Sequence, residues 1–227
     1  RRISQTMLYV GPLATLAISP AVNFDPINPI KLMFITTLSF YAFGIFLAEF
    51  SSFKTKFSKA EMLGFGSFIV FLTLPLIFSG APFTQQIWGS FGRNTGFLTY
   101  ISLLLTLICV SVIQDDITYK KVILALVLTS VLVSAYCLIQ IAGLDPIGWS
   151  LKDTFGTLGN TNFLSAFLGM SGLACLAITL DKSFSLILRV LSAMLSLLEF
   201  LIALSTKSIQ GVMIYIAGVG ILIAFLI

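Results

Sequence analysis

Residues 122–143 read VILALVLTSVLVSAYCLIQIAG, a run of 22 residues without a charged side chain. An α-helix rises about 1.5 Å per residue, so a run of this length crosses the roughly 30 Å of hydrocarbon in a bilayer. The stretch therefore predicts a membrane-spanning helix.

Similar apolar runs recur along the chain, and together they predict an all-α, polytopic transmembrane bundle of about eight spans. Barrel strands are excluded because the runs are long and uniformly apolar instead of alternating. The predicted spans are Met7–Val22, Ile30–Phe50, Met62–Ser79, Phe97–Ile113, Val122–Gly143, Phe163–Leu180, Phe184–Ser205 and Val212–Ile227.

The composition excludes a soluble domain. Hydrophobic residues make up 58% of the chain and charged residues 10%, against about 25% charged residues in soluble domains. The net charge of +4 lies in short loops between spans, so it indicates topology and does not predict a nucleic-acid partner.

The distribution of lysine and arginine predicts the orientation of the bundle. Nine basic residues fall in one set of loops and four in the other, and the richer set belongs in the cytoplasm together with the N-terminus. The loops then predicted to face outward are 23–29, 80–96, 144–162 and 206–211.

We treat residues 1–227 as a single transmembrane domain. The chain starts without methionine and stops inside an apolar run, so we expect it to be the N-terminal part of a longer protein. Cys109, Cys137 and Cys175 each lie in an apolar run without a CxxC pair and are interpreted as small packing residues. With no histidine in the chain, we expect no metal site and no cofactor.

The second outer loop ends in FGRNTG at residues 91–96. Glycines allow backbone N–H groups to converge on an anion, and arginine grips phosphate with two parallel hydrogen bonds. Arg93 is therefore a candidate anion-binding residue. The alternative is an interfacial arginine that anchors a helix end.

The third and fourth outer loops hold further polar candidates. Asn160 and Asn162 either shape a binding site or simply cap the helix that follows them. Lys207, Ser208 and Gln210 either meet an anionic substrate or form an ordinary polar turn.

Glu199 is the one acidic residue well inside a predicted span. A carboxylate there is costly, so we expect it to pair, to take up a proton or to face a wet cavity. Structural and functional interpretations stay equally open.

Four segments, taken in order, resemble the O-antigen ligase and polymerase superfamily, which includes bacterial protein O-oligosaccharyltransferases. Residues 156–167 (GTLGNTNFLSAF) resemble its G-x-x-G-N-x-N-[FY]-L-A segment. Residues 91–96 are similar to its F-G-x-x-R-x-x-G approach to a span, and 25–31 (DPINPIK) to its early outer loop. Residues 204–211 (LSTKSIQG) stand where the family shows T-x-S-R-G.

The resemblance implies a membrane glycosyltransferase at the outer face of the bacterial inner membrane. The implied donor is a glycan on undecaprenyl diphosphate, and the acceptor is lipid A core, a protein hydroxyl or a growing glycan. It implies Arg93 as a diphosphate contact, Lys207 as a second cation, and no metal; the catalytic residues stay unknown.

The chain departs from the family's pattern in two places, and the glycosyltransferase function has two alternatives. The S-R-G arginine is replaced, leaving Lys207 as the nearby cation, and the family's larger later outer loop, with its arginine and histidine, is not in these residues. The alternatives are a transporter or flippase for a lipid-linked or small polar solute, and an assembly subunit without chemistry.

Overall fold

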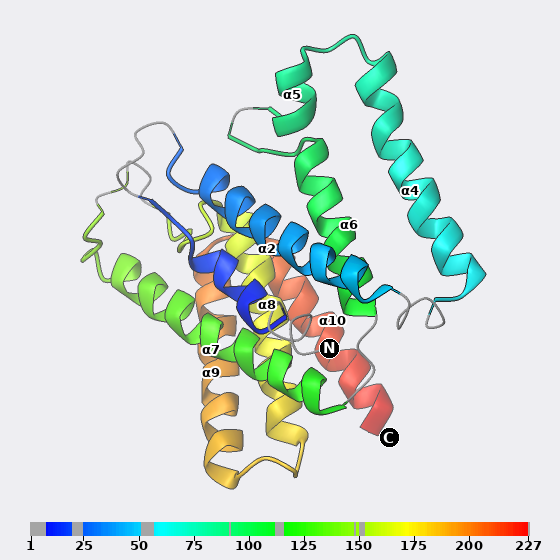
Figure 1. Ribbon diagram of the computed structural model, residues 1–227. Helices are drawn as coiled ribbons and strands as arrows, with labels where there is room; N and C mark the ends of the chain where they lie inside the picture. Colours follow the sequence, from blue (N-terminus) through cyan, green and yellow to red (C-terminus); the bar gives the residue numbers. More distant parts are fainter. Residues whose placement is uncertain are drawn as a thin grey trace. The chain divides into compact units, whose positions relative to one another are not determined.

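The computed structural model describes residues 8–19, 25–50, 57–90, 92–111, 116–147, 149 and 153–226, and these are helical with no strand (Figure 1). This confirms the predicted all-α class. The elements are η1 (Gly11–Leu16), α2 (Asn28–Ala48), α4 (Lys59–Phe78), α5 (Phe83–Trp88), α6 (Phe97–Ser111), α7 (Asp116–Ile141), α8 (Thr161–Leu180), α9 (Leu186–Ser205) and α10 (Ile209–Leu226).

The chain divides into two compact units, Arg1–Lys121 and Val122–Ile227, with the boundary near the start of α7. We call them unit 1 and unit 2 and describe each by itself. The single transmembrane domain expected for the whole chain stays a prediction.

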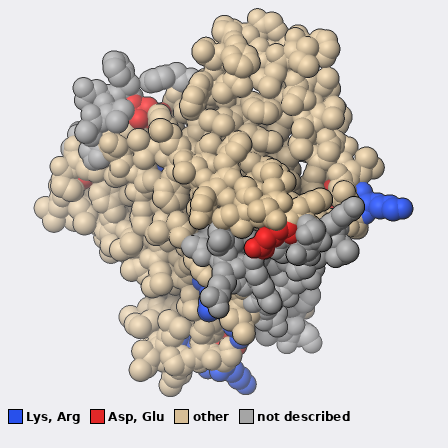
Figure 2. All heavy atoms as spheres, viewed as in Figure 1, with Lys and Arg blue, Asp and Glu red and all other residues tan. Residues whose placement is uncertain are grey.

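Five helices of the described residues are long and apolar enough to cross a membrane, namely α2, α4, α7, α8 and α9. The apolar helices α6 and Ile209–Ala224 of α10 are shorter. The protein is thus a multi-pass membrane protein by the length and composition of its helices, while the count of eight spans is not confirmed. Most of the surface visible in Figure 2 carries no charged side chain.

The stretch predicted as the first span is α-helical over only part of its described residues, 8–19. Residues 8–10 are α-helical, and the chain then continues as the six-residue 3₁₀ helix η1, which starts at Gly11-Pro12 and ends where Ala17 becomes extended. Proline removes one backbone donor, so the helical ladder is weakened at that point. The Lys31 ammonium group on α2 donates to the carbonyls of Ala14 and Thr15, at 3.1 and 2.5 Å, and satisfies the end of η1.

In unit 1, α2 and α6 pack through a buried polar and apolar seam. The hydroxyls of Ser39 and Thr106 lie 3.0 Å apart, and Ser102 Oγ donates to Thr36 Oγ1 at 3.1 Å. The apolar core between the same two helices consists of Ala42, Phe46, Leu104, Ile108 and Cys109.

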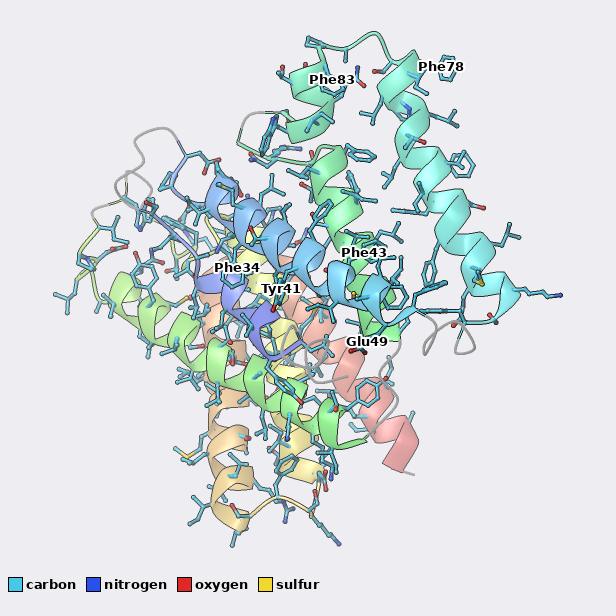
Figure 3. The ribbon with its side chains drawn as sticks, viewed as in Figure 1. Phe34, Tyr41, Phe43, Glu49, Phe78 and Phe83 are labelled. Atoms are coloured by element: carbon cyan, nitrogen blue, oxygen red, sulfur yellow. The ribbon has the colours of Figure 1, made fainter. Side chains whose placement is uncertain are left out.

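Helix α4 begins at a capping box, in which Ser58 and Glu61 exchange hydrogen bonds. It buries no residue, and Leu63, Phe71 and Ile77 are each 72% exposed. Removing one such side chain from water gains about 1.5–3 kcal/mol, so a helix like this belongs in lipid or against an apolar partner. Phe78 and Phe83 stand at the turn between α4 and α5 (Figure 3).

In unit 2, α8 is the central helix and packs against both α9 and α10. Glycines make the α8–α10 contact close, because a Cβ added at Gly211 would overlap the Ser165 carbonyl. Val127 of α7 packs with Cys175 and Ile178 of α8 in a second core cluster. All three cysteines are buried and unpaired, as packing residues should be.

Candidate functional site

The loop that carries Arg93 closes tightly on itself at one end of unit 1. The backbones of Gly89 and Gly96 lie so close together that a Cβ on either residue would overlap the backbone on the opposite side of the loop. Gly89, Gly92 and Asn94 have positive φ angles of 85°, 77° and 50°. These conformations favour glycine and asparagine, which explains the local sequence.

The first predicted outer loop is tied to the second by one side chain. Asp25 Oδ1 accepts from the backbone N–H groups of Ile27 and Asn28 at 3.1 and 3.0 Å, as in an Asx turn. Asn28 Nδ2 donates to Asp25 Oδ2 at 3.1 Å and to the Gly92 carbonyl at 2.8 Å. Segments 64 residues apart are thereby joined at the same end of the unit.

A pocket of about 480 Å³, lined by both polar and apolar groups, lies at this end, between the start of α2 and the α5 loop. Amide, hydroxyl, indole and glycine backbone groups contribute to its wall. Its lining residues are Pro29, Thr84, Gln85, Trp88, Gly89, Ser90 and Asn94.

A groove of about 340 Å³ adjoins the pocket and shares Gln85, Gly89 and Ser90 with it. Its other side consists of apolar residues of α4, among them Phe71 and Leu76, and the start of α6. A further apolar hollow of about 380 Å³ follows between the same two helices, lined by Phe65, Phe68 and Leu107 among others. The pocket thus adjoins a groove at one end of the α4–α6 interface, and the apolar hollow lies further along the same two helices.

Arg93 is exposed in the turn beside this pocket. Its backbone N–H donates to the Ser90 carbonyl at 3.1 Å, and its neighbour Asn94 lines the pocket. Phe91 of the FGRNTG segment lies outside the described residues.

In unit 2, Asn160 is the N-cap of α8. Its Oδ1 accepts from the Asn162 backbone N–H at 2.8 Å, so the capping interpretation applies to Asn160. The Asn162 side chain is exposed in the first turn of α8.

The segment before this cap is held by residues that sequence reasoning missed. Gln140 Oε1 accepts from the Gly156 N–H at 2.8 Å, and its Nε2 donates to Asp145 at 2.9 Å. Tyr136 OH donates to Asp145 at 3.0 Å and accepts from Trp149 Nε1 at 2.8 Å. The available signal was the i, i+4 spacing of Tyr136 and Gln140 at the end of an otherwise apolar run.

The turn holding Lys207 packs beside the first turns of α8. Ser165 Oγ donates to the Ser208 carbonyl at 3.1 Å and accepts from the Gly211 N–H at 3.0 Å. Lys207 is exposed with a φ of 58°, and Gln210 is exposed. The Ser208 hydroxyl is buried and has no hydrogen-bond partner among the described residues.

Glu199 lies on α9 and is fully buried, away from this turn in the sequence. The predicted site residues therefore fall in three places: Arg93 in unit 1, the α8–α10 end of unit 2, and the interior of unit 2. The first two sets belong to loops predicted to share the outer side, and their joint action stays a prediction.

Among the residues that the structure describes, no group of three or more Cys, Asp or Glu side chains is arranged to hold a metal ion. The superfamily resemblance rests on the quoted motifs and stays a prediction. Comparison of the chain with protein-family models, with curated proteins and with solved structures gives no match.

Proposed function

We propose that this protein is an O-antigen ligase-like glycosyltransferase at the outer face of the bacterial inner membrane. It moves a glycan from an undecaprenyl-diphosphate carrier to lipid A core, a protein hydroxyl or a growing glycan. The observation that carries the proposal is the pocket of unit 1, which adjoins a groove that extends onto the apolar residues of α4.

The polar side chains of the pocket match the head of such a donor. A diphosphate accepts hydrogen bonds, and the residues that line the pocket include Trp88, Gln85, Asn94, Thr84 and Ser90, whose side chains carry donors. Arg93 stands next to it and would bind the phosphates bidentately. When the sugar is transferred, the bond between its anomeric carbon and the diphosphate oxygen breaks, and the departing oxygen gains charge that Arg93 stabilises.

The groove between α4 and α6 matches the tail of the donor. A polyprenyl chain is long and apolar. The α4 side of the groove and the further hollow consist mainly of phenylalanine and leucine side chains, while the loop side of the groove carries Gln85, Gln86 and Ser90. Helix α4 buries no residue, so one flank of this path is open to lipid. An amphiphile can therefore enter sideways and place its head at the pocket.

In unit 2, taken by itself, the exposed groups assigned to substrate binding lie near the starts of α8 and α10. Lys207 offers a second cation, and Asn162 and Gln210 offer exposed amides near the starts of α8 and α10. Asn160 and Ser208 support the fold at this end: the Asn160 side-chain oxygen caps α8, and the Ser208 backbone carbonyl accepts from Ser165.

The test is to delete the gene in cells that make a lipid-linked glycan and to locate the glycan that accumulates. A transferase acts after the donor has crossed the membrane, so the glycan should accumulate on the lipid in the outer leaflet, accessible to an external glycosidase on spheroplasts. Complementation with wild type should restore attachment to the acceptor.

The matched pair of variants is Arg93→Ala and Lys59→Ala, two exposed basic residues at opposite ends of unit 1. Loss of a charge-assisted contact of about 1.5–3 kcal/mol predicts a fall in attachment of about ten- to a hundredfold for Arg93→Ala. Lys59→Ala should restore attachment fully. Wild-type attachment by Arg93→Ala at normal protein level would refute its diphosphate role.

A transporter or flippase is the second candidate, and the buried Glu199 is the observation in its favour. Charged residues inside transport proteins commonly mark substrate or ion paths. The same deletion separates the two functions, because loss of a flippase leaves the lipid-linked glycan on the cytoplasmic leaflet, protected from the glycosidase.

A further inference from the structure

Glu199 lies in the interior of unit 2, where three other helices supply its surroundings. It is 0% exposed and belongs to α9, one of the helices long and apolar enough to span the membrane. Gly172 of α8 makes room for it, because a Cβ at that position would lie 3.6 Å from Glu199 Oε2 and 2.8 Å from the Tyr215 ring.

One carboxyl oxygen of Glu199, Oε2, lies beside neutral hydrogen-bond donors. Oε2 accepts from Ser171 Oγ at 2.9 Å, and Cys175 Sγ lies 3.9 Å from it, both on α8. The Ser130 hydroxyl of α7 also lies beside this carboxyl group. Hydroxyl and thiol groups are neutral, so they orient the carboxyl without balancing a negative charge.

The other oxygen, Oε1, is buried and has no hydrogen-bond partner among the described residues. Buried polar atoms are nearly always partnered, and an unpartnered one needs an explanation such as a bound species. An ionised carboxyl would leave Oε1 negatively charged with no donor or cation beside it among the described residues, so the position favours a neutral carboxyl or a bound cation.

No described basic side chain of unit 2 supplies that cation. Arg189 lies ten residues earlier on α9, about 15 Å along the axis, and its Nε donates to the Thr179 carbonyl at 2.8 Å. Lys207 is exposed in the turn after α9, and Lys182 is exposed in the connection before it. The remaining source of positive charge is a small cation that enters from water.

We propose that Glu199 is a proton-binding site inside the membrane, with the proton on Oε1 and the carboxyl oriented through Oε2 by Ser171. The proton comes from water and returns to water, and no other bond changes. A proton fits better than a metal ion, because a metal ion needs several oxygen ligands, and no group of three or more Cys, Asp or Glu side chains among the described residues is arranged to hold one. The proposal stands apart from the glycan-transfer function.

The titratable groups near Glu199 come from two helices. Cys175 is the direct neighbour from α8. Tyr215 of α10 packs beside Gly172, and its hydroxyl lies 2.8 Å from Ser196 Oγ, which in turn donates to the Gly172 carbonyl at 2.8 Å. From α7 the neighbour is the Ser130 hydroxyl.

Infrared difference spectroscopy on the purified chain in liposomes tests the proposal, since it detects a protonated carboxyl directly. The wild-type minus Glu199→Gln spectrum should contain the C=O stretch of a protonated carboxylic acid at neutral pH, and the band should shift in D₂O. Ser171→Ala should shift the same band, because the hydrogen bond to Oε2 is lost. Glu61→Gln, which removes an acid from the exposed first turn of α4, is the matched control and should leave the band unchanged.

Sodium and potassium salts distinguish the proton from a metal cation. The band should have the same intensity in either salt at fixed pH and should fall as the pH is raised. A carboxylate signal in place of the acid band at neutral pH would overturn the proposal. Loss of the acid band in sodium but not in potassium would also overturn it and assign the position to a sodium ion.

Discussion

A single side-chain oxygen fixes the start of α8. Asn160 Oδ1 accepts from the Asn162 N–H at 2.8 Å, so replacing Asn160 with alanine removes the cap and should lower the free energy of unfolding by about 1 kcal/mol. Asn160→Asp keeps an accepting oxygen and should stay near wild type. Unfolding in detergent, followed by far-UV circular dichroism, measures the difference.

Asn162→Ala is the control for this substitution, because the Asn162 side chain is exposed and contributes only its backbone N–H to the cap. Equal stability losses for Asn160→Ala and Asn162→Ala would contradict the assignment. From the sequence, both asparagines were candidates for either capping or binding. The choice between them depends on the residue at which the helix begins, and a spacing of two residues does not determine it.

At the scale of elements, the approach of α8 and α10 depends on the absence of a side chain at Gly211. A Cβ there would overlap the Ser165 carbonyl, which is backbone and cannot move aside cheaply. Gly211→Ala should therefore separate the two helices, break the Ser165–Gly211 hydrogen bond and destabilise the protein by about 1–3 kcal/mol. Thermal unfolding in detergent is the measurement.

Gly220 offers a matched control on the same helix, since a Cβ there meets nothing within 4 Å. Gly220→Ala should be neutral or stabilising by up to about 1 kcal/mol, because alanine favours the helix. If Gly211→Ala unfolds at the same temperature as Gly220→Ala, the close packing of α8 on α10 is wrong.

The sequence predicted most helices well where length and apolarity decide the outcome, as in α7 and α8. It failed where local geometry competes with apolarity. At the Gly11-Pro12 pair the α-helix of residues 8–10 gives way to a 3₁₀ helix, and α5 is too short, at six residues, for its periodicity to be recognised. The pairing of Asn28 with Gly92 was also out of reach, because it depends on how α2 and α6 pack.

At the scale of the whole molecule, basic residues mark both ends of the helices in each unit. In unit 1 the pocket and Arg93 lie at the end opposite to Lys59, and in unit 2 Lys207 and Lys182 lie at opposite ends of α9. The sequence predicts that Arg93 and Lys207 face outward. The proposed function requires this orientation, since its donor and acceptor meet outside the cytoplasm.

Cysteine labelling on intact cells tests that orientation most directly. The variants are Arg93→Cys, Lys207→Cys, Lys59→Cys and Lys182→Cys, and the wild type serves as a blank because its three cysteines are buried. A membrane-impermeant maleimide should label Arg93→Cys and Lys207→Cys from outside, and the other two only after the membrane is permeabilised. Labelling of Arg93→Cys and Lys207→Cys from opposite sides, or of both only from the cytoplasm, would contradict the account.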